Sequence, residues 1–233
     1  VPCQGDNSMG FDALVRGNNR FALEFYRQLS EEEGNLFVSP FSVSTAFAMA
    51  WAGATGDTAQ QMGKAFHFKG NKAGVHTAFR QLLDELNSQG KNGNMQLSLA
   101  NALWGQEDVA FCDGYIATLQ TYYDSALKQV NFRRHPEKAC HTINEWVASQ
   151  TAGKIDNLLP RSAVTPLTRL ILTNAVYFKG TWQSKFKKES TRPREFHLLA
   201  GESPKVPTMH QTGRFGYTET DSVQVLEMFY KKC

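Results

Sequence analysis

Two side chains with metal-binding chemistry stand four residues apart in the sequence, His141 and Glu145. On a helix this spacing brings both to one face, where an imidazole and a carboxylate could hold a metal ion weakly. A stable site needs at least a third ligand, and the six histidines are scattered along the chain. We therefore expect an exposed pair of side chains at this place and no metal site.

The four cysteines, Cys3, Cys112, Cys140 and Cys233, are far apart and form none of the C-x-x-C pairs that zinc and redox sites use. An even count permits disulfides, but free thiols fit a chain of this length equally well, so the redox compartment stays open. The sequence also lacks the G-x-S-x-G, G-x-x-x-x-G-K-[ST] and H-E-x-x-H motifs. We expect neither enzymatic activity nor a cofactor.

A buried amide is the third chemical feature. The stretch LILTNAVYFKGTW, residues 170–182, reads as one long apolar strand that contains a single amide, Asn174, and closes with Gly180 and Trp182. A buried amide costs about 1 to 3 kcal/mol unless it is hydrogen-bonded. Taken alone, the pattern predicts a satisfied core amide at Asn174 and ordinary aromatic packing at Trp182.

Composition bounds the class of protein. The chain has 233 residues, 41% of them hydrophobic and 12% aromatic, which is enough for one sizeable core. A net charge of +3 from 25 basic and 22 acidic residues does not favour a nucleic-acid partner. No apolar run has the length of a spanning helix, and the first ten residues lack the blocks of a signal peptide, so we expect no membrane partner.

Helix signals dominate the first half of the chain. Ser39 and Pro40 match an N-cap and a first-turn residue, and the segment after them is apolar nearly all round, which predicts a core helix. Asp57 and Gln60 have the spacing of a capping box that opens the next helix. Further helical faces carry Phe21, Phe25 and Leu29, then Val75, Phe79, Leu82, Leu83 and Leu86, then Tyr115, Leu119 and Tyr122. Pro136 starts another predicted helix, with Ile143, Trp146 and Val147, that ends near Gly153.

Strand signals follow. Met95, Leu97 and Leu99 alternate with polar or small residues, and a second strand is predicted around 127–132. After the apolar stretch at 170, strand patterns dominate: REFHLLA (194–200), KVPTMHQTGR (205–214), FGYTET (215–220) and VQVLEMFYK (223–231). We therefore predict an α+β protein in which helices come first and mostly antiparallel strands last, with residues 1–233 forming a single domain.

Three segments carry a family resemblance: NLFVSPFSVSTAFAMAWAGATGDTAQQM, INEWVASQTAGKIDNLL and LILTNAVYFKGTWQSKF. Together with KVPTMHQTGRFGY and VQVLEMFY, they resemble the serpins, the serine protease inhibitor family, in the family's order from about Arg20 to Lys231. The resemblance implies N-terminal helices packed on a large, mostly antiparallel sheet, with parts of a second and a third sheet.

The resemblance gives the amide a role. In serpins the strand that Leu170–Phe178 resembles lies third in the large sheet, and its Asn belongs to a shutter where the neighbouring strands part. Asn174 would belong to that shutter, with Ser39 and Ser42 of the buried helix beneath it. A small cluster of polar groups can exchange hydrogen-bond partners when strands move.

Two further positions follow from the same resemblance. Trp182 sits where the family keeps its breach tryptophan, at the place where an inserting strand first enters the sheet. The helix over 136–152 would lie across the front of the sheet, with Ile143 and Trp146 facing the strands. An amphipathic helix that simply covers a sheet fits the same residues.

Inhibitory serpins are metastable. A target serine protease, or a cysteine protease in some cases, cuts an exposed reactive loop, which then inserts into the large sheet and traps the enzyme. The serpin supplies no catalytic residue. The sequence stops in VQVLEMFYK, before the reactive loop and the closing strands that the family has, so we expect these residues to be part of a larger object. Either a second polypeptide carries the remainder, the molecule was cut or prematurely ended, or a different molecule completes the sheet. A non-inhibitory carrier or chaperone on the same scaffold stays open.

One charged segment bears on further partners. Lys185, Lys187, Lys188, Arg192 and Arg194 cluster in sequence and could contact a polyanion such as a glycosaminoglycan. The helix that serves this purpose in some serpins corresponds to residues 73–89, which offers only Arg80 amid Asp84 and Glu85. A solvated surface is our default interpretation. We expect a secreted or extracellular location in preference to a cytoplasmic one.

Overall fold

The computed structural model describes residues 7–89, 95–125, 127–198 and 201–231, without the side chains of residues 7–9 and 89. These residues form two compact units. The first contains residues 7–89 and 97–177, and the second contains residues 95–96 and 178–231. The expectation of a single domain stays a prediction.

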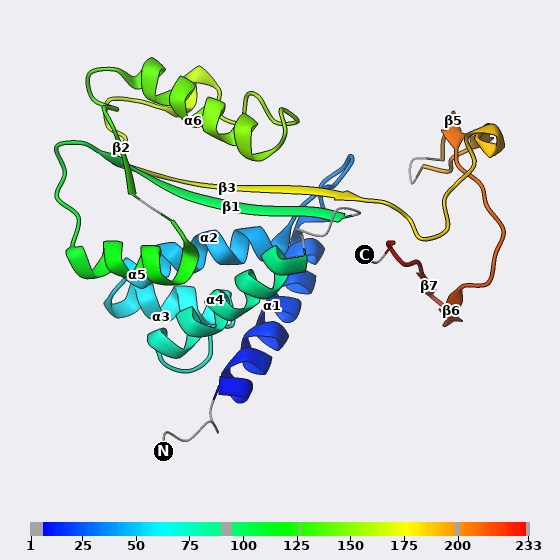
Figure 1. Cartoon of the computed structure of the whole chain (residues 1–233), viewed down its shortest axis with the longest axis horizontal. Coiled ribbons are helices and arrows are strands. Elements are labelled where there is room, and N and C mark those ends of the chain that lie inside the picture. The colour runs from blue at the N-terminus through cyan, green and yellow to red at the C-terminus, as the bar shows by residue number, and fades with distance from the viewer. Residues whose placement is uncertain (1–6, 90–94, 126, 199–200, 232–233) are drawn as a thin grey trace. The chain divides into compact units, whose positions relative to one another are not determined.

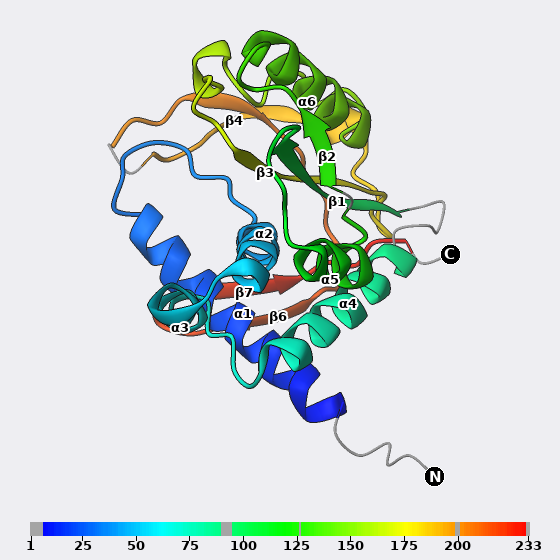
Figure 2. The ribbon, with the colours of Figure 1, turned by 90° about the vertical axis from the view of Figure 1, so that its left-hand side faces the viewer.

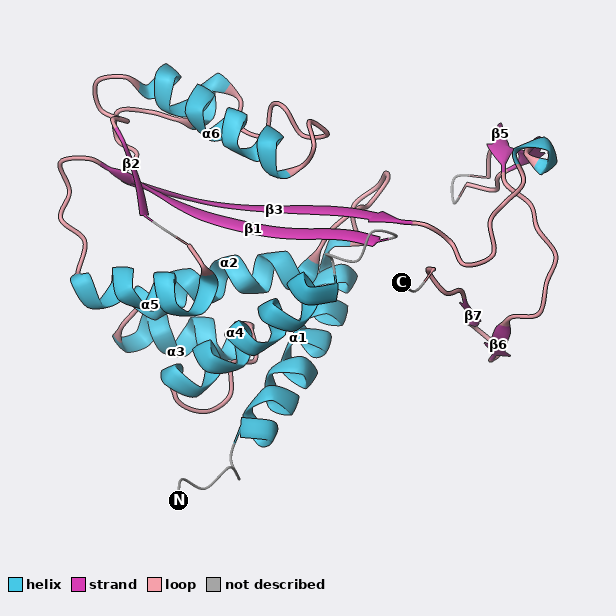
Figure 3. Cartoon of the chain, in the orientation of Figure 1, coloured by secondary structure: helices cyan, strands magenta, loops and turns pink. Residues whose placement is uncertain are grey.

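Helices make up most of the first unit (Figure 3). They are α1 (Asn7–Leu29), α2 (Pro40–Gly53), α3 (Gly56–Ala65), α4 (Lys72–Gln89), α5 (Asp113–Tyr123) and α6 (Pro136–Gln150), with a short 3-10 turn at Arg161–Ala163. All the predicted helices are present. Ser39 does occupy the N-cap of α2, but its hydroxyl makes no capping bond.

The predicted capping box is wrong. Helix α3 begins at Gly56 with Thr55 at its N-cap, so Asp57 lies inside the first turn. The positive φ of Gly56, +55°, lets the chain turn into the helix one residue before Asp57. The Asp57 carboxylate can still interact favourably with the helix dipole there.

One sheet crosses the first unit, in the order β2 (Leu127–Val130), β1 (Met95–Gln106), β3 (Leu170–Gly180). Strands β1 and β2 are parallel, with Leu103 opposite Leu127. The Gln106 backbone N–H donates to the Arg169 carbonyl, and the Asn174 side-chain Nδ2 donates to Asn101 Oδ1. Because the partner's residue number rises on one strand as it falls on the other, β1 and β3 run antiparallel. Along its other edge β3 has no strand partner among the described residues.

The sheet is covered on both faces (Figures 1 and 2). Side chains alternate across a strand, so each strand of the sheet serves two layers. Leu103 and Leu172 pack with the core of the helices α2, α4 and α5, whereas Trp104 and Ile171 pack against α6 on the opposite face. This double cover explains why the sequence of β3 is apolar at successive positions.

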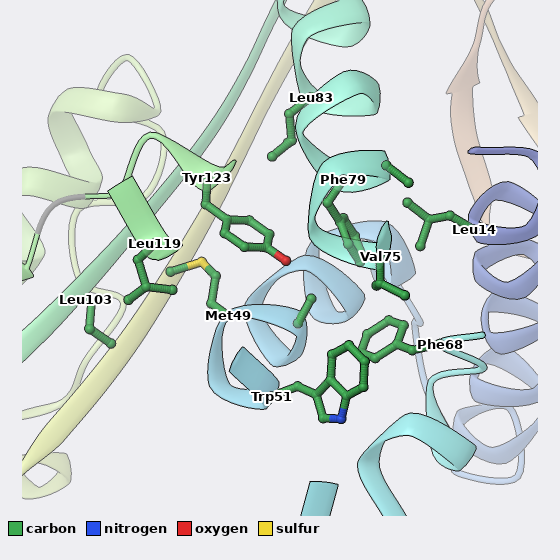
Figure 4. Close-up of a cluster of buried hydrophobic side chains, with 12 residues drawn as sticks. Leu14, Met49, Trp51, Phe68, Val75, Phe79, Leu83, Leu103, Leu119 and Tyr123 are labelled. Carbon is green, nitrogen blue, oxygen red and sulfur yellow. The ribbon is translucent and has the colours of Figure 1, made fainter. Parts of the chain in front are cut away.

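The larger core lies between those helices and the sheet (Figure 4). It joins apolar side chains from α1, α2, α4, α5 and β1: Leu14, Met49, Trp51, Val75, Phe79, Leu83, Leu103, Leu119 and Tyr123. Met49, Phe79, Leu103 and Leu119 are completely buried. The near absence of polar side chains around α2 is therefore a consequence of its central place in this core.

A polar group is buried in that same core. His76 on α4 is 3% exposed, and its Nδ1 shares a 2.7 Å hydrogen bond with the Tyr123 hydroxyl from α5. The rings of Trp51 and Tyr122 flank the imidazole. Burial, with a smaller contribution from the Lys72 ammonium, lowers the pKa of His76 to about 4.

Two hairpins form most of the second unit: β4 (Arg192–Glu195) with β5 (Lys205–Thr208), and β6 (Gly216–Glu219) with β7 (Gln224–Glu227), both antiparallel. The predicted strand at 194–200 is wrong beyond Glu195. There the Phe196 N–H bonds the Pro204 carbonyl and the Leu198 N–H bonds the Glu202 carbonyl, which closes the hairpin loop. Residues 199 and 200 lie outside the described residues.

Acid should weaken the first unit through His76. An unfolded imidazole binds its proton near pH 6.5, and the folded one near pH 4, so between these values the unfolded chain binds more protons. The free energy of unfolding should therefore fall as the pH drops from about 6.5 to 4, by up to about 3 kcal/mol. Urea unfolding at a series of pH values measures this.

The matched control is the exposed histidine of α6, His141. His76→Gln should flatten the dependence between pH 6.5 and 4, whereas His141→Gln should leave it as in the unaltered chain. Equal slopes for all three proteins would contradict the role assigned to His76.

Candidate functional site

The amide of Asn174 has a partner on the neighbouring strand. Its Nδ2 donates to Asn101 Oδ1 on β1 at 2.6 Å, and both side chains are half-buried. Both residues share the alternation of Leu103 and Leu172, so both face the helices and not α6. The cross-strand pair therefore lies on the sheet face that packs on the core containing α2.

The two predicted serines also meet each other. Ser39 Oγ and Ser42 Oγ are 2.9 Å apart at the start of α2, with Ser42 buried and Ser39 half-buried. The hydroxyl of Ser39 thus bonds a side chain in place of the backbone N–H that a capping serine would bond. Such a hydroxyl pair keeps lone pairs available for a further donor.

The three predicted shutter residues are therefore divided between two pairs, Ser39 with Ser42 and Asn174 with Asn101, which was not predicted. Within the part of the chain that the structure describes, no hydrogen bond joins Ser39 or Ser42 to Asn174. Asn101 was missed by the sequence reasoning, although a signal existed: it interrupts the apolar series of Leu97, Leu99 and Leu103. A polar residue at an inward position of a half-buried strand indicates a buried polar partner.

Helix α6 faces the sheet as predicted. Ile143 and Val147 are completely buried, and Trp146 packs edge to face on Trp104 of β1, with ring centroids 5.8 Å apart. The indole N–H of Trp104 donates to Thr173 Oγ1 on β3 at 2.9 Å. The helix thus rests on side chains that themselves link two strands.

In the second unit, Trp182 is part of an aromatic stack. Its ring lies parallel to that of Tyr230, with centroids 4.4 Å apart, and Phe178 packs on Tyr230 edge to face. The backbones of Trp182 and Tyr230 form an antiparallel bridge. Gly180 makes room for this stack, because a Cβ there would lie 2.5 Å from the Tyr230 ring.

The cationic segment is exposed throughout. Its five predicted polyanion contacts, Lys185, Lys187, Lys188, Arg192 and Arg194, are all open to solvent. Arg192 and Arg194 are two apart on β4 and so share one face, while Glu195 lies opposite Lys205 in the hairpin. Exposed charges of mixed sign fit a solvated surface as readily as a polyanion site.

The candidate metal and thiol chemistry can also be placed. His141 Nε2 and Glu145 Oε1 are 3.3 Å apart on the exposed side of α6, and no cluster of three metal-ligating side chains occurs among the described residues. Cys112 is a free, exposed thiol and Cys140 a free, buried one. Cys3 and Cys233 lie outside the described residues. No helix in the described ranges combines the length and apolarity needed to cross a bilayer.

Comparisons with known proteins place these features in a family. A family model described as serpin (serine protease inhibitor) matches residues 16–233. The leukocyte elastase inhibitor of Bos taurus is 42% identical over 224 residues, which cover 94% of this chain and 58% of that protein. Antithrombin-III of Mus musculus is 38% identical over 226 residues, which cover 94% of this chain and 48% of that protein.

A solved structure agrees. Ovalbumin from emu superposes with a TM-score of 0.87 at 29% sequence identity, and the match covers 94% of this chain and 60% of that one. The chain therefore spans between 48% and 60% of the length of these three proteins.

The Asn101–Asn174 pair can be tested by a double-mutant cycle. Asn174→Leu leaves the half-buried Asn101 amide without its partner, so we expect the free energy of unfolding to fall by about 1 to 3 kcal/mol. Replacing both residues by Leu removes both polar groups and should recover most of the loss. Urea unfolding of the four proteins gives the coupling energy.

Asn19→Leu on the exposed surface of α1 is the control and should change the free energy of unfolding by no more than about 0.5 kcal/mol. Additive effects of the two core substitutions would show that the two amides do not depend on each other.

Proposed function

This chain belongs to the serpin family, and we propose that it forms the body of a suicide-substrate inhibitor of serine proteases. In this proposal a reactive loop, carried outside these residues, is cut by the protease and inserts as a new strand beside β3. The chain itself supplies the sheet and no catalytic group, and the protease supplies the nucleophile.

One observation carries the proposal. Strand β3 is 11 residues long and is packed by helices on both faces, yet only one of its edges is paired within the described residues. An apolar strand of this length with an open edge is a template for a further strand. A closed sheet, in contrast, would offer no row of free backbone donors and acceptors to an incoming loop.

The polar pairs would let the sheet rearrange as a further strand enters. We propose Asn174, together with Ser39 and Ser42, as the shutter, and we add Asn101 because its Oδ1 accepts a 2.6 Å hydrogen bond from Asn174 between β1 and β3. A hydrogen bond between side chains contributes only about 0.5 to 1.5 kcal/mol net, so partners can exchange at low cost. Interlocked apolar side chains could not exchange in this way without leaving a cavity.

Trp182 is proposed as the breach residue, where insertion begins. Its stack on Tyr230 joins the segment after β3 to the segment after β7, so an entering strand would have to part aromatic rings there. Helix α6 is proposed as the element that shifts over the sheet, because Trp146 rests on Trp104, which bonds β3 through Thr173.

The proposed partners are a target serine protease, with cysteine proteases as a second class, and a polypeptide that carries the rest of the serpin fold. Relatives that this chain matches, an elastase inhibitor and an antithrombin, bear names of protease inhibitors. We place the complete protein outside the cell in this proposal. The second candidate function is a carrier or chaperone that uses the same scaffold without trapping a protease.

Inhibition is tested by completing the fold. The chain is coexpressed with the C-terminal part of the bovine leukocyte elastase inhibitor, and the purified assembly is incubated with trypsin, chymotrypsin or elastase. We expect a complex with one of them that survives boiling in detergent, because the trapped acyl-enzyme is covalent. The protease with its catalytic serine blocked is the control.

Clean cleavage with no such complex for all three proteases would favour the carrier or chaperone. A complex that forms equally with the blocked protease would contradict the covalent mechanism.

A separate prediction concerns glycosaminoglycans: we expect the chain not to bind them at physiological salt. We expect the chain to leave a heparin column below physiological salt, since exposed charges alone are strongly screened at an ionic strength of about 0.15 M. Retention above that salt concentration, lost when Lys187, Lys188 and Arg192 are replaced by Gln, would instead establish the cationic segment as a polyanion site.

A further inference from the structure

An open-sided hollow of about 410 Å³ lies in the first unit, between the end of α2, helix α3 and the loop that leads to α4. Its volume is within the range that small-molecule sites have. Its floor is buried or half-buried and its rim is exposed: Trp51, Ala59, Gly63 and Phe68 line the floor, and Lys64 and Lys69 line the rim. None of these residues belongs to the proposed shutter or breach, so the role of the hollow is separate from protease inhibition.

Two aromatic rings close the hollow toward the larger core (Figure 4). Trp51 is 6% exposed and Phe68 is 8% exposed, and their ring centroids are 5.1 Å apart. The indole N–H of Trp51 donates to the Ala59 carbonyl at 2.8 Å, so it is not available to a ligand. The two rings therefore offer a ligand apolar surface and no hydrogen-bond donor.

The floor is open because residue 63 has no side chain. Gly63 lies inside α3, where glycine is destabilising relative to alanine. Its φ is not positive, and a Cβ there would lie 3.7 Å from Cζ2 of Trp51, an ordinary van der Waals distance. Neither the backbone nor the packing of α3 therefore requires a glycine at this position. Its consequence is that an edge of the Trp51 indole stays uncovered.

The cations at the rim have no counter-charge close by. Within the described ranges, no carboxylate lies within 4 Å of the exposed Lys64 or Lys69 ammonium groups. A third residue of the hollow, His67, already bonds the Glu24 carboxylate at 2.7 Å. Lys64 and Lys69 are therefore the two positive charges that a ligand would meet.

One further cation near the floor is already engaged. The Lys72 ammonium lies 5.2 Å from the centroid of the Trp51 ring, and it donates to the carbonyl oxygens of Trp51 and Ala54 at the end of α2. These bonds neutralise part of the negative end of the helix dipole. Lys72 therefore stabilises the end of α2 that carries the floor, and it is not counted among the charges open to a ligand.

An apolar floor with a cationic rim favours one class of ligand. An inorganic anion would leave the floor in contact with water, and a neutral apolar molecule would leave both ammonium groups without a partner. The edge of an indole ring carries a partial positive charge and prefers to meet the face of another ring. The combination favours a ligand that has an aromatic body and one anionic group.

We propose that this hollow binds a small aromatic carboxylate. The ring packs on Trp51 and Phe68 in the space that Gly63 leaves, and the carboxylate accepts charge-assisted hydrogen bonds from the Lys64 and Lys69 ammonium groups. Because both lysines are exposed, salt screens this part of the interaction, and the aromatic contact supplies most of the affinity.

The test uses 1-naphthylacetate as the probe and 1-naphthylacetamide, which has nearly the same shape and no charge, as its counterpart. Isothermal titration calorimetry on the whole chain at low ionic strength measures both affinities. We expect saturable binding of 1-naphthylacetate with a Kd below about 1 mM, and an affinity about fivefold weaker for the amide.

Gly63→Leu tests the floor, because the new side chain occupies the space over the indole edge. It should abolish binding of both compounds, and urea unfolding confirms that the variant is folded. The matched control is Gly10→Leu, the same change at an exposed position of α1, which should leave both affinities as in the unaltered chain.

A second pair of variants tests the rim. Lys64→Gln combined with Lys69→Gln should lower the affinity for 1-naphthylacetate to that of the amide and leave the amide unchanged. Lys138→Gln combined with Lys154→Gln makes the same change of net charge at exposed positions outside the hollow, and should alter neither affinity.

Four results would each overturn the proposal. The first is the absence of saturable binding of 1-naphthylacetate up to about 1 mM, and the second is equal affinity for the acid and the amide. The third is a Gly63→Leu chain that binds the acid as tightly as the Gly10→Leu control. The fourth is a Lys64→Gln, Lys69→Gln chain that keeps the affinity of the unaltered chain for the acid.

Discussion

Strand β3 is covered on both faces but, among the residues that the structure describes, is paired along one edge only, and the proposed function depends on this constraint. Its alternate side chains are held by the helical core on one side and by α6 on the other, so the strand cannot leave the sheet without exposing apolar surface. Its free edge, however, leaves backbone groups that only another strand satisfies well. The strand is therefore held in position by packing on both faces, and its unpaired edge can still bind a further strand.

The polar residues follow from that constraint. A sheet sealed on both faces has little access to water, so each buried amide or hydroxyl needs a partner inside the protein. The Asn174 side chain donates a hydrogen bond to Asn101, and the hydroxyls of Ser39 and Ser42 share one. The Trp104 indole N–H donates to Thr173. Each of these bonds joins neighbouring strands or sits at the helix start beneath them, so the polar groups are placed where the proposed motion needs bonds that are easily exchanged.

Much of this could be predicted from the sequence, because periodicity reports burial. The apolar run around α2 predicted a core helix, and the alternation after Met95 predicted β1. The predictions were less accurate at chain turns. The capping box at Asp57 was displaced by a glycine at positive φ, and the strand at 194–200 gave way to a hairpin loop closed by backbone hydrogen bonds that no side-chain pattern reveals. The apolar series that Asn101 interrupts indicates a buried polar partner, but the identity of that partner could not be predicted, since neither strand's sequence alone determines the cross-strand register.

Hydrogen exchange along β3 tests the central claim most directly. The amides of residues 170–178 that point away from β1 should exchange quickly in the chain alone and become strongly protected when the C-terminal part of a serpin is bound, while amides paired to β1 stay protected throughout. Slow exchange at all of these amides in the chain alone, or no added protection in the assembly, would show that β3 has no open edge to offer and would contradict the account.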